Sequence, residues 1–421
     1  MRILFVVEHF PCLSETFVLN QITGLLDRGH QVEIYPLGLP SEGPIHSDVQ
    51  RYDLMSHVWR KPAIPRGRLR RVTTAGGIIA GNMPRGGAKL LRTLNVPRYG
   101  RDAANLKLCF GGVPFLKSRS EFDIVHCHFG TNGVSALSWR EADLWRGKLT
   151  VAFHAHEIAG FTDKAGRRYY RNLFNSDARL LPVSDFWCRK LIAWGANPDR
   201  VTVHRMGIDC EAIEFQPKSI PQDRSVEIIS VCRLVEQKGL EYALRAIASL
   251  SRGRSGVHLT IVGDGPLRDE LVALASELGV SGAVTFLGAQ PQDRVRTLLA
   301  TSHVFLAPSV TAADGLMEGI PVSIMEAMAA GLPVVATRHS GIPELIEDGV
   351  SGFLVGERDV AGLSEGLSWL MSEPSWVKGS QIAARNVVES RYNIRSLVLD
   401  LERIFEEELS AAADQPARSE L

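Results

Sequence analysis

The sequence predicts an α/β protein made of two doubly wound, Rossmann-like domains that face a cleft. Short β-branched apolar runs alternate with amphipathic helical patterns, which is typical of a parallel sheet covered by helices on both faces. This alternation occurs twice, and the proline-rich polar stretch "MGIDCEAIEFQPKSIPQDRSVE" separates the two occurrences. A chain of 421 residues is also too long for one ordinary core.

The apolar runs of the first half predict its strands. After the first strand, "RILFVVEHF", the segment "SETFVLNQITGLLDRGH" predicts an amphipathic helix that ends near Gly29. Ser14 is the expected N-cap of this helix. Further strands are expected in "QVEIYPLG", "FDIVHCHFG", "LTVAFHAHE", "ARLLPVS" and "RVTVHRMGID".

The second half repeats this pattern. Strands are expected in "VEIISVCRL", "VHLTIVGDG", "AVTFLG", "HVFLAPS", "LPVVAT" and "GFLVG", with helical patterns between the first four. The segment "SLVLDLERIFEEEL" predicts a last amphipathic helix before a terminal tail. We therefore expect a first domain at 1–205, a linker at 206–225, a second domain at 226–385, and a C-terminal helix with its tail at 386–421.

The composition is that of a globular protein, with 45% hydrophobic and 22% charged residues. Its six cysteines are widely spaced and form no CxxC pair, which favours reduced thiols in a cytoplasmic protein over disulfides or a zinc site. Glu8 interrupts the apolar N-terminus, so this segment is expected to be a strand and not a signal peptide. No apolar run reaches the ~18 residues that a membrane-spanning helix needs.

The overall charge of zero conceals a basic segment at 62–119. This segment contains twelve basic residues and a single acid, Asp102. Two interpretations of this basic run are equally favoured. It forms either a solvated helical face or a surface that contacts anionic lipid head groups. Nucleic acid is less favoured, because only Tyr99 and Phe110 could stack on bases.

Two cations follow the first strand of the second half, in "CRLVEQKG". Arg233 and Lys238 fall in a strand-to-helix loop, where helix amides also point outward, and this combination suits a phosphate or diphosphate. A pair of exposed loop cations is the alternative. The nearby motif "VGDGPLR" has two glycines but not the third glycine of a dinucleotide-binding fingerprint. A tight turn into the next helix accounts for these two glycines.

Two carboxylates, Glu318 and Glu326, stand in the nearly uncharged stretch "EGIPVSIMEAMAAGLPVVAT". A helix is expected from near Ile320 to Ala330, with Gly331 as its C-terminal stop, so Glu318 precedes the helix and Glu326 lies inside it. The pair could serve a glycosidase. Carboxylates also accept hydrogen bonds from sugar or ribose hydroxyls, and a nucleotide-activated sugar would employ both these acids and the two cations.

These motifs resemble the family-four retaining glycosyltransferases of GT-B architecture. "EGIPVSIMEAMAAGLPVVAT" is similar to the family's E-x7-E signature, and "CRLVEQKGLEYALRA", "VGDGPLR", "HVFLAPS" and "GIPELIEDGVSGFLV" occur in the family's order. The N-terminal "FPCLSETFVLNQITGLLDRGHQVEIY" and "VHCHFG" resemble the exopolysaccharide, colanic-acid branch. The resemblance implies a GT-B fold whose C-terminal helix crosses back onto the first, acceptor-binding domain.

The resemblance also implies roles for individual residues. Arg233 and Lys238 would hold the donor diphosphate, and Glu326 would hold the ribose hydroxyls. Glu318 and His154, which follows a strand in "FHAHE", would meet the transferred sugar as the catalytic residues. The main chain of Gly319, Ile320, Pro321 and Val322 would contact sugar and phosphate. His156 and Glu157 are neighbours that could contact either substrate.

One departure from the family concerns the first loop, where "HFPCLSETF" replaces the glycine pair that many members carry. The Ser14–Thr16 segment could do similar work, and whether it meets donor or acceptor stays open. The chain has no D-x-D motif, so no metal is expected at the diphosphate. A nucleotide-sugar co-substrate takes the place of a bound cofactor.

The expected function is transfer of a hexose from a nucleotide-diphosphate sugar to a growing, lipid-linked saccharide in exopolysaccharide biosynthesis. The enzyme would be cytoplasmic and peripheral at the inner membrane face, through residues 62–119. A nucleotide-sugar epimerase or hydrolase on the same scaffold is one alternative. A non-catalytic sugar-nucleotide sensor is another.

Overall fold

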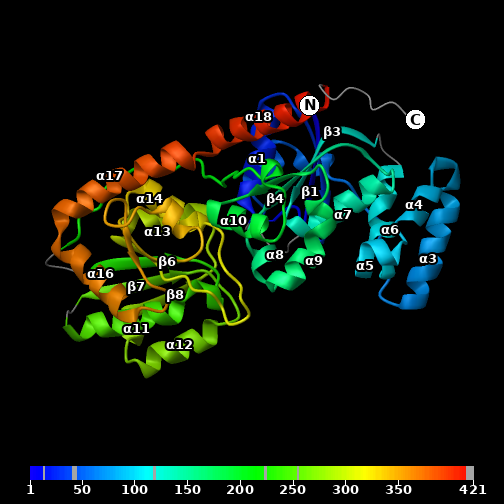
Figure 1. The fold of residues 1–421 in the computed structure, drawn as a ribbon. Coiled ribbons are helices and arrows are strands. Elements are labelled where there is room, and N and C mark those ends of the chain that lie inside the picture. The colour runs from blue at the N-terminus through cyan, green and yellow to red at the C-terminus, as the bar shows by residue number, and fades with distance from the viewer. Residues whose placement is uncertain (13–14, 40–44, 117–119, 222–224, 254–255, 414–421) are drawn as a thin grey trace.

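The computed structural model describes residues 1–12, 15–39, 45–116, 120–221, 225–253 and 256–413. Each of its two domains is built on one parallel β-sheet (Figure 1). The first sheet has the order β2-β1-β3-β4-β5 and the second the order β11-β10-β9-β6-β7-β8. The predicted pair of Rossmann-like domains is confirmed.

The first sheet forms because its strands are apolar on both faces. Its strands are β1 (Arg2–Val7), β2 (Gln31–Pro36), β3 (Glu121–His128), β4 (Arg146–Phe153) and β5 (Arg179–Pro182). Residues 3–7 of the inner strand β1 are fully buried, as a strand covered by helices on both sides requires. β3 and β4 end at His128 and Phe153, so the chain leaves both strands at the same edge.

The second sheet follows the same logic. Its strands are β6 (Val226–Val231), β7 (Val257–Val262), β8 (Val284–Gly288), β9 (Val304–Ala307), β10 (Val334–Thr337) and β11 (Phe353–Val355). β6 lies between β9 and β7, so the order of the strands reverses direction beside β6. Ligands of doubly wound sheets bind beyond the carboxyl ends of the strands at such a switch point.

Helices cover both sheets and fill the connections. The helices of the first domain are α1 (Thr16–Asp27), α2 (Ser47–Arg51), α3 (Arg68–Gly81), α4 (Ala88–Arg92), α5 (Val96–Ala104), α6 (Lys107–Gly112), α7 (Gly130–Glu141), α8 (His156–Ala159), α9 (Asp163–Phe174) and α10 (Asp185–Ala193). Those of the second are α11 (Leu240–Gly253), α12 (Arg268–Glu277), α13 (Gln292–Thr301), α14 (Val322–Ala330), α15 (Ile342–Leu345), α16 (Val360–Ser372) and α17 (Pro374–Arg391). Short 3-10 turns occur at Leu54–His57, Met83–Arg85, Val113–Leu116, Pro198–Arg200, Glu236–Lys238 and Ser281–Ala283.

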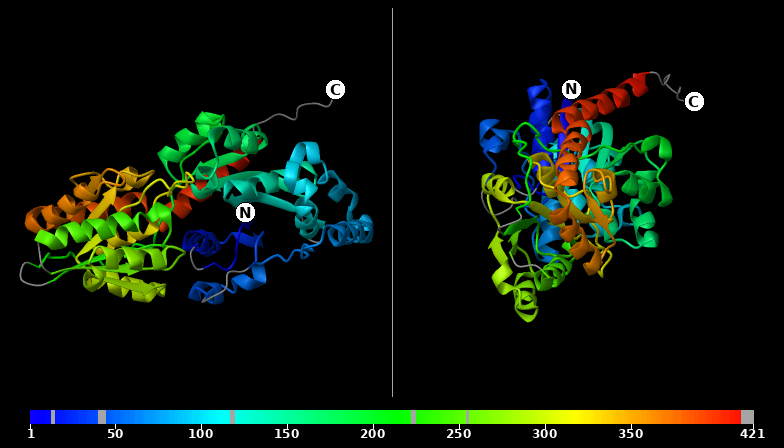
Figure 2. Two further views of the ribbon diagram at one scale, coloured as in Figure 1. Left: turned by 90° about the horizontal axis from the view of Figure 1, so that it is seen from below. Right: turned by 90° about the vertical axis from the view of Figure 1, so that its left-hand side faces the viewer.

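The last helix, α18 (Ile394–Ala413), returns to the first domain. α17 and α18 run from one domain to the other along one side of the molecule, as Figures 1 and 2 show. Apolar residues of α18, including Leu401 and Phe405, are fully buried in one core with β1 and α1. The predicted crossing of the C-terminal helix is therefore confirmed.

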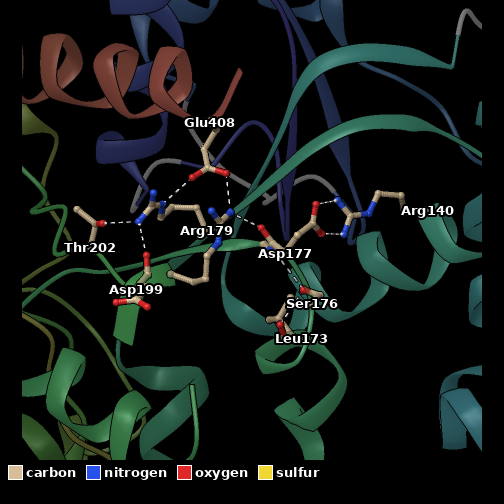
Figure 3. A network of polar contacts seen from close by, with 10 residues as sticks. Arg140, Leu173, Ser176, Asp177, Arg179, Asp199, Thr202 and Glu408 are labelled. Carbon is tan, nitrogen blue, oxygen red and sulfur yellow. Dashed lines mark hydrogen bonds and ion pairs between the residues drawn. The ribbon is translucent and has the colours of Figure 1, made fainter. Parts of the chain in front are cut away.

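A buried carboxylate fastens α18 to the first domain. Glu408 is 1% exposed, and its two oxygens accept hydrogen bonds from Arg179 Nε at 2.8 Å and Arg200 Nη2 at 2.5 Å (Figure 3). The network continues to Asp177. Its main-chain carbonyl oxygen accepts a hydrogen bond from Arg200, and its side-chain carboxylate pairs with Arg140. A buried carboxylate needs such partners, because ionised groups are costly to remove from water.

The basic segment between β2 and β3 forms α3 to α6, at the end of the first domain far from the second sheet (Figure 1). Its last two cations, Lys117 and Arg119, lie outside the described residues. Within α3, Leu69 and Val72 are 79% and 60% exposed beside exposed arginines. The described helices contain none that is long and apolar enough to cross a membrane.

Two details differ from the sequence predictions. The stretch at 200–209 is not a strand, since it makes only isolated bridges from Val201 to Leu180 and from Ile208 to Asn393. Its first half lies beside β5, where the main-chain N–H groups of Thr202 and His204 donate to Leu180 and Pro182, but the pairing does not extend beyond a single bridge. α14 begins at Val322, not near Ile320, because Pro321 has extended backbone angles and serves as the N-cap. Ser14, the expected cap of α1, lies outside the described residues.

Candidate active site

A cavity of about 1030 Å³ opens between the two domains at the carboxyl ends of both sheets. Its wall on the first domain includes His154, and its wall on the second includes Arg233, Lys238, Glu318 and the segment Gly319–Val322. The sequence-predicted residues therefore converge on one cavity, with Glu326 as the exception.

Lys238 and Glu318 form an ion pair at the cavity wall. The distance from Lys238 Nζ to Glu318 Oε2 is 2.7 Å, and the two side chains are only 16% and 14% exposed. Lys238 ends a 3-10 turn after β6, whereas Glu318 lies in the loop before α14. The fold thus joins residues 80 positions apart, each able to compensate the other's charge when no ligand is present.

Arg233 is the free cation of this wall. Its side chain is exposed at the cavity, and it forms no ion pair with another described residue. The loop that carries it packs against the "VGDG" turn, where Gly263 has φ +132° and an added Cβ would lie 1.8 Å from the carbonyl oxygen of Cys232. Gly263 therefore serves the turn, as the sequence predicts, and a guanidinium beside the turn can hold two oxygens of a phosphate.

The loop before α14 brings the two domains into contact. An added Cβ on Gly319 would lie 2.9 Å from the carbonyl oxygen of His154 in the first domain, so only glycine permits this approach. Pro321 caps α14 without a side-chain hydrogen bond, and the first main-chain amides of the helix have no partner within it. The N-terminal end of α14 thereby offers N–H groups and a partial positive charge at the cavity.

His154 is a packed, neutral histidine. It is 9% exposed; its Nε2 lies 2.9 Å from Nδ1 of His128 and its Nδ1 lies 3.2 Å from Sδ of Met206. Burial, with a smaller contribution from His204, lowers the pKa of His154 to about 3. At neutral pH the ring is therefore uncharged, and it meets the cavity between the aromatic rings of Phe17 and Phe129.

Glu326 lies deeper in α14 and is not part of the cavity wall. Its Oε1 accepts a hydrogen bond from Nε2 of Gln292, at the start of α13, at 2.6 Å. Burial raises the pKa of Glu326, while Gln292 and the nearby Arg296 counteract this effect. Its predicted contact with a ribose stays a prediction.

The first-domain wall also contains two carboxylates, Glu157, which the sequence suggested as a possible substrate contact, and Glu15. Glu157 is 6% exposed, and its Oε1 accepts hydrogen bonds from the main-chain N–H groups of His154 at 2.8 Å and Gly130 at 3.2 Å. Burial raises its pKa to about 7, although these amides lower it. Burial also raises the pKa of Glu15 to about 7, with an opposing effect from His9.

The backbone is strained where this wall begins. Phe129 and Ala155, which follow the ends of β3 and β4, have φ angles of +71° and +92°. Such angles are rare for residues other than glycine and cluster at functional sites. The sequence offers no signal for them, since both residue types are ordinary.

A second interdomain contact lies beside the cavity and was missed by sequence reasoning. The carboxylate of Glu344 accepts hydrogen bonds from the main-chain N–H groups of Asp185 at 2.9 Å and Phe186 at 2.8 Å, at the N-terminus of α10. Trp187 of the same helix donates its Nε1–H to the carbonyl oxygen of Glu318 at 3.3 Å. The motif "GIPELIEDG" contains Glu344, but the sequence does not reveal its partner in the other domain.

The described residues include no cluster of three or more His, Cys, Asp or Glu side chains that could hold a metal ion. The cysteines at 12, 109, 127, 188, 210 and 232 form no disulfide in the described part of the chain.

Comparison with known families assigns the chain. The family described as "Glycosyl transferases group 1" matches residues 212–390, and "Glycosyltransferase Family 4" matches residues 14–212. The chain belongs to the family-four glycosyltransferases. It is therefore a transferase, and the two family matches together span both domains.

Two curated relatives of this glycosyltransferase cover most of its length. A protein from Salmonella typhimurium named as the colanic acid biosynthesis glycosyltransferase WcaL is 36% identical over 378 residues, which are 87% of this chain and 90% of WcaL. The amylovoran biosynthesis glycosyltransferase AmsK of Erwinia amylovora is 36% identical over 411 residues, 96% of this chain and 99% of AmsK.

Solved structures share the GT-B fold of this glycosyltransferase. Anabaena HepE, crystallised with UDP and glucose, has a TM-score of 0.71 at 19% identity and covers 97% of this chain and 100% of its own. A glycosyltransferase from Rickettsia africae also has a TM-score of 0.71, at 17% identity, with 97% and 98% covered. Together with the two parallel sheets, these matches confirm the predicted fold.

Proposed function

We propose that this glycosyltransferase moves a hexose from a nucleotide-diphosphate sugar to a growing, lipid-linked saccharide in exopolysaccharide biosynthesis. One observation carries this proposal: Arg233, Lys238 and Glu318 on one domain and His154 on the other line a single cavity. The names of WcaL and AmsK support an exopolysaccharide product, and the complex of HepE with UDP and glucose supports a nucleotide-sugar donor.

Charge divides the cavity into two parts. We assign the diphosphate to Arg233, Lys238 and the first amides of α14, because this wall supplies cations and N–H donors. A diphosphate that engages Lys238 would release the Glu318 carboxylate from its ion pair to accept hydroxyl hydrogens of the sugar. Gly319–Val322 would contact sugar and phosphate through the main chain, and Glu326, set by Gln292, would take the ribose.

The proposed reaction retains the configuration of the sugar. The bond between the anomeric carbon and the diphosphate oxygen breaks as the acceptor hydroxyl attacks from the same face, and the departing phosphate takes the hydroxyl proton. No protein nucleophile and no metal are used, since Arg233, Lys238 and the amides of α14 supply the positive field for the leaving group. Neutral His154 would offer its ring to the donor sugar without adding charge.

The test is to supply UDP- and GDP-hexoses with and without hexosides that carry a long alkyl chain. The proposal predicts a glycosylated product, with donor consumption that depends on acceptor and an unchanged anomeric configuration by NMR. Release of free sugar at the same rate without acceptor would indicate a hydrolase. Interconversion of the donor would indicate an epimerase, and binding without turnover would indicate a sensor.

We further propose that the protein docks on the inner membrane face through the basic segment. Exposed Leu69 and Val72 on α3 stand among Arg68 and Arg70, and Met83 and Leu91 after them are each 51% exposed. Apolar side chains beside arginines suit an anionic lipid surface, where each cation contributes about 1 kcal/mol.

The membrane proposal is tested by co-sedimentation with vesicles at low salt. Arg68→Glu with Arg70→Glu should weaken binding to anionic vesicles by at least about tenfold. The matched control is Arg245→Glu with Lys378→Glu, which reverses two exposed cations of the second domain and should bind normally. Equal weakening by both pairs, or no binding by the unmodified protein, would refute this docking surface.

A further inference from the structure

The main chain of Glu318 is held from both sides. Its N–H donates to Nε2 of His339 at 3.0 Å, and its carbonyl oxygen accepts from Oγ of Ser340 at 2.6 Å as well as from Trp187. With Lys238 on the carboxylate, both the peptide and the side chain of Glu318 are fixed. All four of these partners lie outside the motif at 318–337 that contains Glu318.

His339 has one arrangement of its ring protons that satisfies its neighbours. It is fully buried just after β10, and its Nδ1 lies 2.6 Å from Oε1 of Glu357. A main-chain N–H can only donate, so Nε2 must accept from Glu318 and the proton must reside on Nδ1. Glu357 then accepts the Nδ1–H, which fixes this tautomer.

Glu357 is well suited to remain a carboxylate. Its Oε2 accepts from the main-chain N–H of Thr311 at 2.8 Å, and its Oε1 lies 3.2 Å from the Thr311 hydroxyl. Partial burial opposes the charged form, but the hydrogen bonds from Thr311 and His339 prevail and hold its pKa below the ordinary value. The charge of Glu357 lies on the side of His339 away from Glu318.

The loop after β10 has a backbone conformation that brings Ser340 and Gly341 against the segment around Glu318. Ser340 has φ +49°, an unusual value for serine, and this backbone turns its hydroxyl toward the Glu318 carbonyl. An added Cβ on Gly341 would lie 2.7 Å from the side chain of Ile320, so this glycine allows the loop to close on the segment that follows Glu318.

We propose that His339 is a positioning residue for Glu318, and that Glu357 sets the tautomer through which it acts. His339 does not line the cavity, so it acts on the reaction only through the Glu318 peptide. Displacement of this peptide would move the Glu318 carboxylate away from Lys238 and from the bound sugar. The kinetic part of the inference rests on the proposed role of Glu318, whereas the tautomer does not.

The first test needs no substrate. A long-range proton–nitrogen NMR spectrum at pH 8, with the His339 signals assigned by their loss in His339→Gln, should show a protonated Nδ1 and a bare Nε2. A protonated Nε2 would overturn the proposal. This result can be read even if the proposed function fails.

The second test compares two amide replacements. In His339→Gln the side-chain oxygen can occupy the place of Nε2 and accept from Glu318. In His339→Asn the shorter amide can reach Glu357 but not Glu318. We expect His339→Asn to lower kcat by about 10- to 100-fold, and His339→Gln to remain within about threefold of the unmodified enzyme.

Thermal unfolding separates positioning from general damage, because both replacements remove the same buried ring. The proposal predicts similar losses in Tm for the two variants but different losses in kcat. Equal kcat values for the Asn and Gln variants, whether both high or both low, would overturn the role of the Nε2 contact.

Discussion

At the scale of single residues, the ion pair between Lys238 and Glu318 is the centre of the proposed site. The pair is largely buried, so each partner compensates a charge that would otherwise be left poorly solvated. The same two groups are assigned to different parts of the donor. In this proposal, the ion pair belongs to the ligand-free state, and binding of the donor must separate Lys238 from Glu318.

Removal of either partner should abolish transfer. Lys238→Met removes the positive charge that is assigned to the diphosphate, and Glu318→Gln weakens the hydrogen bonds to the sugar. Each substitution is therefore expected to lower kcat/KM by at least about 100-fold. Initial rates with a saturating acceptor provide the measurement. Glu241→Gln, in the exposed pair of Glu241 with Arg245, is the matched control and should act normally. Near-normal turnover by the Lys238 or Glu318 variant would contradict their roles.

Glu157 predicts how stability depends on pH. Its pKa is raised from 4.5 to about 7 in the folded protein, so ionisation of the buried carboxyl reduces stability as pH rises through this window. Glu157→Gln keeps an oxygen for the amides of His154 and Gly130 but removes the charge. The free energy of unfolding of Glu157→Gln minus that of the unmodified protein should therefore increase by up to about 3 kcal/mol between about pH 4.5 and 7.5.

Urea unfolding at several pH values measures this effect. The exposed Glu406→Gln is the control and should show a difference that does not vary with pH. A pH-independent difference for Glu157→Gln would show that the carboxyl is not perturbed as described.

The sequence was informative for residues next to strand ends and silent about partners. Arg233, Lys238 and Glu318 could be predicted to share a cavity, because each follows a strand or precedes a helix at the same rim. The contacts of His154 with His128 and Met206, and of Glu318 with His339, join segments whose proximity depends on the complete fold. The hydrogen bond from Gln292 to Glu326, which joins α13 to α14, likewise could not be read from spacing, and the predicted contact of Glu326 with a ribose stays a prediction.

At the scale of elements, periodicity and glycine placement predicted most of the structure. The apolar strands and the stop of α14 at Gly331, with φ +85°, lie where the pattern places them. The stretch at 200–209 has the apolar alternation of a strand, but a strand also requires a neighbour with which to form a ladder. Beside β5 this stretch makes one bridge and two main-chain hydrogen bonds, from Thr202 and His204, and no continuous ladder results.

The attachment of α18 to the first domain depends on Glu408. Glu408→Ala would leave Arg179 and Arg200 without their shared carboxylate in a buried setting, at a cost on the order of 3 kcal/mol. Chemical denaturation would measure the loss. The exposed neighbour variant Glu406→Ala should change stability by less than about 0.5 kcal/mol. A loss no larger than that of the control would contradict the anchoring role of Glu408.

At the scale of the whole molecule, the two domains meet at glycine-dependent and charged contacts beside the cavity. Gly319 allows the loop of Glu318 to approach His154, and Glu344 caps α10 across the boundary. Sequence patterns predicted two domains and a returning helix, but not these contacts. The predicted domain limits at 205, 225 and 385 remain predictions. The helix α17 continues across position 385.

The proposed function depends most on binding of a nucleotide-diphosphate sugar in the cavity through the cations of the second domain. The direct measurement is calorimetric titration of UDP-hexoses, then GDP-hexoses, into the unmodified protein, Arg233→Gln and Lys238→Met. We expect one donor to bind the unmodified protein, to raise its stability by about 2.7 kcal/mol at 100 times Kd, and to bind each variant at least about tenfold more weakly. Binding of equal strength to all three proteins, or no binding of any donor to the unmodified protein, would contradict this function.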